Sequence, residues 1–287
     1  MYFPWDKYEE CPVERINTLQ VFITNDCNLH CTGCFARNIM GEEKTHMSLE
    51  EYMEAVQTAY LKGARRITLI GGEPLLHPDL RNMIAYNRLW KDLKTTIYTN
   101  GYYLDRYTKD DLEGVKIRIS VYCKSGKTKS VYHLPKTDIP FDICFMVSRK
   151  TTVEEMVDAA DYVEENHNCK VFFISSLREL DNRAEEFFDD TDLTMPVMDY
   201  KRLVHNFLED YNGNMEIHIS KRGVFESTIN QTGNKCRFAN YSIGGKIIQC
   251  PYDIVNLKFQ LNYEYDKRYC QHNNTCLMTK IKLIPKK

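Results

Sequence analysis

Six short apolar segments, separated by stretches with helical spacing, restrict the fold of this chain more than any other feature. Each segment combines β-branched, aliphatic and aromatic residues, which is typical of a strand. The predicted strands are 18–24, 66–70, 95–98, 115–122, 141–147 and 170–174. Helices are predicted over 48–62, 80–90 and 152–166, with a short one near Asp110. Because strands that alternate with helices pair in parallel through right-handed crossovers, the sequence predicts an α/β fold with a parallel sheet.

Three cysteines follow the first predicted strand directly. Cys27, Cys31 and Cys34 have three and then two residues between them. Thiolates this close in sequence can face one point only if the backbone loops around it, which suits an iron-sulfur cluster or zinc. A structural zinc or an electron-transfer cluster normally has four protein ligands. The triad therefore predicts a metal site with one position open to an exogenous molecule.

Two further motifs stand at strand ends. Gly71-Gly72-Glu73-Pro74 follows the second predicted strand, and Thr99-Asn100-Gly101 follows the third. A glycine pair at a strand end permits a tight turn and a close approach of the backbone to a ligand. Since the carboxyl ends of parallel strands meet at one edge, where α/β folds place their chemistry, we expect both motifs near the cysteine triad.

The regular pattern ends near residue 178. A helix over 200–208 and a short strand over 215–219 are predicted, followed by a second group of cysteines. These are Cys236, Cys250, Cys270 and Cys276. Residues 242–248 contain a Gly-Gly turn between two short apolar runs, so a hairpin would bring Cys236 near Cys250. Metal ligation is favoured over disulfides because the chain is long and its 11 cysteines are an odd number.

Composition excludes several classes of partner. A formal charge of -2 and a pI near 6.5 provide no bulk attraction to nucleic acid or to an anionic membrane surface. The sequence has no N-terminal signal pattern and no apolar run long enough to span a membrane. We therefore expect a cytoplasmic protein with reduced cysteines.

The triad, Gly71-Gly72-Glu73-Pro74 and Thr99-Asn100-Gly101 together resemble the radical S-adenosylmethionine (radical SAM) superfamily, over about residues 17–177. The resemblance implies a partial (β/α)6 barrel over 17–177, an N-terminal lead-in over 1–16 and a C-terminal region over 178–287. It also implies that Cys27, Cys31 and Cys34 bind three irons of a [4Fe-4S] cluster, with SAM on the fourth iron. An external one-electron donor such as flavodoxin or ferredoxin would reduce the cluster.

The resemblance implies seven contacts to SAM. They are Gly33, Gly72, Glu73, Asn100, Ser120, Ser148 and Arg149. Gly72 and Glu73 would hold the amino group, and Asn100 and Ser120 would meet the ribose or the carboxylate, as would the two residues past the fifth strand. Gly33 would contact adenine through its backbone, where many family members carry an aromatic residue. A barrel-interior hydroxyl at position 120 and a solvent-exposed charge at position 149 are the alternatives.

The second cysteine group resembles the SPASM/twitch class of radical SAM enzymes. Cys236, Gly245 and Cys250 come close to its pattern, although the first gap is one residue short. This implies a small cysteine-rich twitch-like domain in which Cys236, Cys250, Cys270 and Cys276 hold one auxiliary iron-sulfur cluster, of the [4Fe-4S] type. A four-cysteine zinc site is the structural alternative.

A lone auxiliary cluster accepts an electron from the product, which favours net oxidation by dehydrogenation or cross-linking. Because no peptide-recognition domain is expected before Cys27, we predict a small-molecule substrate such as an aminosugar, with a peptide epimerase or cross-linking maturase as the alternative. For epimerisation, Cys144 and Cys123 are the candidate hydrogen donors. A non-catalytic iron-sulfur or zinc protein is the alternative from another class.

Overall fold

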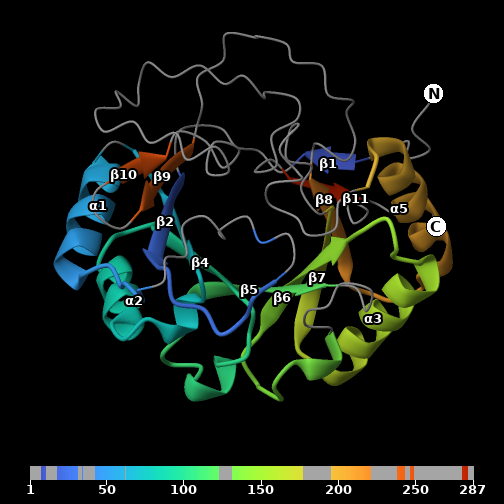
Figure 1. Ribbon diagram of the computed structural model, residues 1–287, viewed down its shortest axis with the longest axis horizontal. Coiled ribbons are helices and arrows are strands. Elements are labelled where there is room, and N and C mark those ends of the chain that lie inside the picture. Colours follow the sequence, from blue (N-terminus) through green and yellow to red (C-terminus); the bar gives the residue numbers. More distant parts are fainter. Residues whose placement is uncertain are drawn as a thin grey trace, which may run out of the picture.

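A single curved sheet organises the chain in its computed structural model (Figure 1). The structure describes residues 8–10, 18–31, 34, 43–61, 63–122, 131–176, 195–220, 238–242, 246–248 and 280–283. Within these residues the strand order is β1-β11-β8-β7-β6-β5-β4-β3-β2-β9-β10. The two edges of the sheet, formed by β10 and β1, do not pair with each other, so the predicted partial barrel is an open, curved sheet.

The central strands run parallel and confirm the six predicted segments. They are β2 (Thr18–Thr24), β3 (Arg66–Gly71), β4 (Lys94–Thr99), β5 (Val115–Tyr122), β6 (Phe141–Val147) and β7 (Cys169–Ser176). The next parallel strand, β8 (Glu216–Ser220), confirms the weaker prediction over 215–219. All their carboxyl ends therefore lie at the same edge of the sheet.

The sheet edges come from the two ends of the chain. On one side β9 (Phe238–Ser242) pairs in parallel with β2, and β10 (Lys246–Ile248) pairs antiparallel with β9. This pairing, with Ser242 opposite Lys246, agrees with the predicted hairpin. On the other side β11 (Lys280–Leu283) pairs antiparallel with β8, and β1 (Tyr8–Glu10) pairs with β11.

Helices cover the convex side of the sheet, with α1 and α2 near β2 and β4, and α3 and α5 near β7 and β8 (Figure 1). Their bounds are α1 (Leu49–Leu61), α2 (Leu80–Arg88), α3 (Val153–Asn166) and α5 (Val197–Asp210). Short 3-10 turns are η1 (Pro74–Leu76), η2 (Leu104–Arg106) and η3 (Val131–His133). Among the described residues, no helix is long and apolar enough to cross a membrane.

Local sequence explains where the helices begin. The Ser48 hydroxyl accepts the Glu51 N–H at 3.1 Å, and the Thr152 hydroxyl accepts the Glu155 N–H at 3.2 Å, so both N-caps are in place. The predicted helix near Asp110 is wrong, because that region is η2 followed by turns that end at Gly114 with φ +70°. Few apolar residues with helical spacing stand there to bury a face.

Strand alternation divides the side chains of the sheet into two sets. Ile143, Phe145 and Val147 of β6 belong to the hydrophobic core. Their neighbours Cys144 and Met146 therefore point to the opposite, concave face. The same alternation places Ser120 and Tyr122 of β5 on the concave face, because Ile119 and Val121 are in the core.

Candidate functional site

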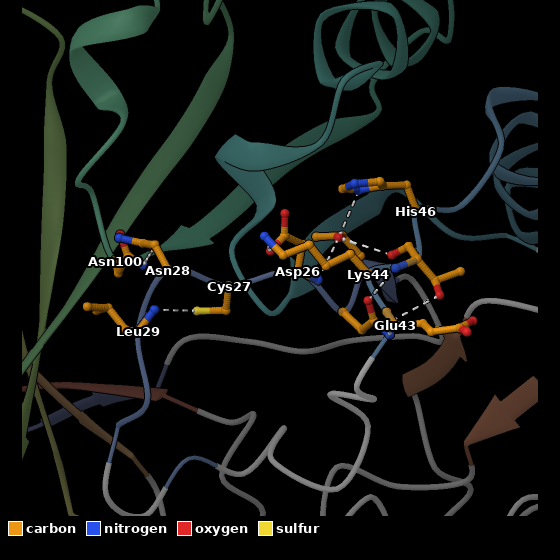
Figure 2. A network of polar contacts seen from close by, with 11 residues as sticks. Asp26, Cys27, Asn28, Leu29, Glu43, Lys44, His46 and Asn100 are labelled. Atoms are coloured by element: carbon orange, nitrogen blue, oxygen red, sulfur yellow. Dashed lines mark hydrogen bonds and ion pairs between the residues drawn. The ribbon is translucent and has the colours of Figure 1, made fainter.

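The cysteine loop begins at the carboxyl end of β2. The Leu29 N–H donates to the Cys27 sulfur at 3.4 Å (Figure 2). The Cys34 N–H donates to the Cys31 carbonyl at 3.2 Å. All three cysteines are free thiols and half-buried. Gly33 lies outside the described residues, so its predicted role is an expectation that the structure does not address.

Electrostatic contacts place the three thiols in one neighbourhood. Burial raises the pKa of Cys27, the Leu29 N–H opposes that shift, and the nearby Glu73 and Cys34 add to it. Burial also raises the pKa of Tyr122 well above its usual value, together with the charges of Cys31 and Cys34. The neutral Tyr122 hydroxyl is hydrogen-bonded to Cys31.

By residue type the loop supplies the donor set of a cluster with three protein ligands, because Cys27, Cys31 and Cys34 are reduced thiols in one short segment. Across the part of the chain that the structure describes, no group of three or more His, Cys, Asp or Glu side chains is arranged to hold a metal ion. The second group, Cys236, Cys250, Cys270 and Cys276, lies outside the described residues, as does Cys123.

The glycine pair packs against the backbone that leads into the loop. A Cβ on Gly72 would lie 2.2 Å from the Asp26 carbonyl oxygen, and one on Gly71 would lie 2.3 Å from the Thr24 carbonyl oxygen. The Gly72 N–H donates to Thr24 at 2.8 Å, and the Glu73 N–H donates to Asp26 at 2.7 Å. The close approach that the glycines permit is therefore to protein backbone just before Cys27.

Glu73 connects the ends of β3 and β4. Its side chain is 0% exposed, and one carboxylate oxygen accepts the Leu75 N–H at 2.9 Å and the Thr99 hydroxyl at 2.6 Å. The other oxygen accepts the Asn100 N–H at 2.7 Å. A buried carboxylate is stable only with such partners, and these come from both strand ends.

Asn100 continues the connection to the cysteine loop. Its side-chain oxygen accepts the Tyr102 N–H at 3.0 Å, and its amide nitrogen donates to the Asn28 side-chain oxygen at 2.8 Å (Figure 2). Asn28 directly follows Cys27. Hydrogen bonds thus run from the buried Glu73 through Asn100 to the first turn of the loop.

The chain that returns from the loop is tied to its entry by residues that sequence reasoning missed. The Asn25 side chain accepts the Thr45 N–H at 2.6 Å and donates to the Glu43 carbonyl at 2.9 Å. Lys44 and Asp26 form an ion pair at 2.8 Å (Figure 2). The Asn-Asp pair before Cys27 was the available signal, because both residues favour side-chain to backbone hydrogen bonds.

The other predicted contacts lie on or near the concave face. Ser120 is half-buried and stands beside Cys144 in the sheet register. Ser148 is 0% exposed, and its hydroxyl accepts the Lys150 N–H at 3.3 Å within a turn. Arg149 is exposed to solvent.

A polar network on the concave face was also missed. Arg118 of β5 is 3% exposed and donates to the Tyr98 hydroxyl at 2.9 Å and to the Asp142 carboxylate at 3.2 Å. Lys116 forms an ion pair with the same carboxylate at 2.6 Å. Cys144 lies two residues after Asp142 in β6. Burial raises the pKa of the Cys144 thiol to about 11, while Arg118 opposes the shift. The Cys144 thiol is therefore protonated at neutral pH.

A chain with this sheet and cysteine loop falls into a known class. The family model described as the Radical SAM superfamily matches residues 21–191. The chain belongs to the radical SAM superfamily, and it is therefore an enzyme of the class that uses a [4Fe-4S] cluster and SAM.

Among curated proteins, the chain is similar to two named GTP 3',8-cyclase. That of Acidothermus cellulolyticus is 30% identical over 134 residues, which are 44% of this chain and 37% of the relative. That of Nautilia profundicola is 30% identical over 138 residues, or 47% and 42% of the two chains. The match thus spans less than half the length of either relative.

Among solved structures, the fold is similar to Streptococcus suis SuiB bound to the precursor peptide SuiA. The TM-score is 0.66 at 17% identity, over 88% of this chain and 64% of SuiB. The native anSMEcpe structure with bound AdoMet gives a TM-score of 0.58 at 17% identity, over 91% of this chain and 79% of that chain. These likenesses show the fold.

Proposed function

We propose that this radical SAM enzyme cleaves SAM reductively beside Cys27, Cys31 and Cys34, and abstracts a hydrogen atom from a polar small molecule. The three thiolates would hold the cluster and leave its fourth iron to SAM. When bound, the two cofactors supply one-electron cleavage of the sulfonium C–S bond, which yields methionine and a 5'-deoxyadenosyl radical. Flavodoxin or ferredoxin is the proposed electron donor.

The observation that carries this proposal is the meeting of three motifs at one edge of the sheet. Glu73 accepts hydrogen bonds from the end of β4, and Asn100 at that end donates to Asn28 in the cysteine loop. Gly72 packs against the backbone before Cys27. These contacts support a site in which Cys27 and the buried carboxylate stand near each other, as the binding of both a cluster and a cationic ligand requires.

The remaining residues receive roles by position. The negative charge of Glu73 would stabilise the SAM ammonium, with the Gly72 backbone beside it. Asn100 and Ser120 are the proposed contacts to the ribose or the carboxylate, with Ser148 and Arg149 assigned to the same end. Gly33 would face adenine.

A polar substrate is supported by the concave face. Arg118, Asp142 and Lys116 form a charged network on the concave face, so that face is not uniformly apolar. Net oxidation, for example of an aminosugar, would require the second cysteine group to hold an auxiliary cluster that takes the product electron.

Cyclisation of a purine nucleotide is the second candidate. It is favoured by the 30% identity with the two proteins named GTP 3',8-cyclase. Peptide modification is the third candidate, with Cys144 as the hydrogen donor if the enzyme is an epimerase. Its protonated thiol on the concave face suits donation of a hydrogen atom.

The test uses the full chain, reconstituted anaerobically with iron and sulfide, and incubated with SAM and dithionite. Release of 5'-deoxyadenosine is expected, and its absence with an intact cluster would reject the proposal. A variant with alanine at Cys27, Cys31 and Cys34 should release none. Cys169→Ala, which changes a reduced cysteine of β7, is the matched control and should behave as the parent does.

The substrate class follows from the same assay. GTP, aminosugars and short peptides are added in turn, and the true class should accelerate 5'-deoxyadenosine release above the rate without substrate. Metal analysis of the triple-alanine variant tests the auxiliary site. About four residual irons per chain support a second cluster, whereas zinc without iron supports the structural alternative.

A further inference from the structure

The Asn28 side chain, between Cys27 and Cys31, is oriented by a hydrogen bond from outside the loop. The Tyr102 N–H donates to the Asn100 side-chain oxygen at 3.0 Å, so that oxygen must point toward Tyr102. The Asn100 NH2 group therefore faces Asn28, to which it donates at 2.8 Å (Figure 2). A donor on Asn100 requires the acceptor oxygen of Asn28 in return.

Because the side-chain oxygen of Asn28 accepts from Asn100, the NH2 group is the remaining polar group of this side chain. No residue that the structure describes accepts a hydrogen bond from it, and the Asn28 side chain is exposed. Asn100 is itself anchored, since its backbone N–H donates to the buried Glu73 carboxylate at 2.7 Å. The amide is thus held in one orientation beside Cys27 with two N–H donors available.

We propose that Asn28 is a SAM-positioning residue, held by Asn100 so that its NH2 group donates to an acceptor oxygen of SAM, in the carboxylate or the ribose. This inference rests on the proposed SAM site at the cysteine loop. It adds a residue to that site, and it gives a reason for the hydrogen bond from the Asn100 side chain to Asn28.

Two substitutions distinguish the hydrogen bond that Asn28 accepts from Asn100 from the one that its NH2 group would donate to SAM. Asn28→Asp keeps the oxygen that accepts from Asn100 but replaces the NH2 group by an oxygen. Asn28→Ala removes both functions. The aspartate also adds a negative charge, which by itself would attract SAM, a net cation. Because the added charge would also repel the SAM carboxylate, the lost donor is the cause only if the uncharged Asn28→Ala weakens SAM binding as well.

The first measurement is equilibrium dialysis of SAM against the reconstituted, oxidised chain. Asn28→Asp is expected to keep the parent's iron content and to bind SAM about tenfold more weakly or worse, which is the usual effect of losing a hydrogen bond to a charged acceptor. SAM binding as tight as in the parent, or tighter, would overturn the proposal. Asn82→Ala is the control, because it removes an exposed hydrogen bond of 3.0 Å on α2 and should change nothing.

The second measurement needs neither cluster nor SAM. Alkylation of Cys27 in the cluster-free chain, followed by mass spectrometry, should be about two- to tenfold faster in Asn28→Ala and unchanged in Asn28→Asp. Equal rates in the parent and Asn28→Ala would show that Asn100 does not hold the loop. If the parent with a full cluster fails to bind SAM, the proposed function itself fails, and parent and variants then fail equally.

Discussion

Gly72→Ala tests whether the glycine pair serves the entry to the cysteine loop. The added Cβ would lie 2.2 Å from the Asp26 carbonyl oxygen and 2.7 Å from its carbon. Both atoms are backbone, so no side chain can rotate away. Gly72 is not among the glycines with positive φ, and the cost of the substitution therefore comes from space alone.

The destabilisation expected for Gly72→Ala depends on how far the Asp26 backbone must shift. Relief of the overlap requires a shift of about 1 Å, and overpacking of this kind typically costs about 1–3 kcal/mol. The shift would weaken the hydrogen bonds from Gly72 to Thr24 at 2.8 Å and from Glu73 to Asp26 at 2.7 Å. Each contributes about 0.5–1.5 kcal/mol, so we expect a loss of about 2–6 kcal/mol in the free energy of unfolding.

The assay is urea unfolding of the cluster-free chain, together with iron content after reconstitution. Gly114→Ala is the matched control, because Gly114 has φ +70° and a Cβ there would meet nothing within 4 Å. It should cost about 1–2 kcal/mol from backbone conformation and leave the iron content unchanged. A Gly72→Ala protein as stable as the parent and equally loaded with iron would refute the reasoning.

Three further predictions concern buried polar groups, each measured by urea unfolding. Asp142→Asn leaves the Arg118 guanidinium, 3% exposed, without its carboxylate, and should lower the free energy of unfolding by about 3–5 kcal/mol. Lys116→Met should lower it by less than about 1 kcal/mol, because the Lys116 side chain is 49% exposed. Burial lowers the pKa of His77, so its contribution to stability is complete above about pH 6.5 and is lost as pH falls through the lowered value; His77→Gln should flatten that dependence. Glu73→Gln places an NH2 group against a backbone N–H and should cost about 1–3 kcal/mol, and an unchanged midpoint would contradict the hydrogen-bond assignment.

The parallel core of the fold could be predicted from sequence because its signals are local. Each strand from β2 to β7 is a short run rich in β-branched, aliphatic or aromatic residues, and the capping residues Ser48 and Thr152 stand at the helix starts. The edges could not be predicted in the same way. The pairing of β9 with β2, and of β1 with β11, joins segments far apart in sequence whose short runs carry no periodic signal for a partner.

In the candidate site, too, the local features could be predicted from the sequence and the contacts between distant residues could not. The residue types and their strand-end positions indicated that Cys27, Glu73 and Asn100 share an edge. The partners of Glu73 could not be predicted, because two of its three donors are backbone N–H groups, which every residue except proline carries. The close neighbour of Gly72 is likewise a backbone carbonyl.

A physical consequence follows for reading the Gly-Gly-Glu motif. Gly72 and Glu73 hold the backbone that enters the cysteine loop, through contacts present without any ligand. Substitutions at either residue should therefore lower cluster content as well as SAM affinity. Loss of SAM cleavage in such variants is not evidence that the altered side chain touches SAM. Asn28→Asp, compared with Asn28→Ala, avoids this ambiguity, because the aspartate keeps the oxygen that accepts from Asn100 and holds the loop, while both variants lack the NH2 donor that faces away from Asn100.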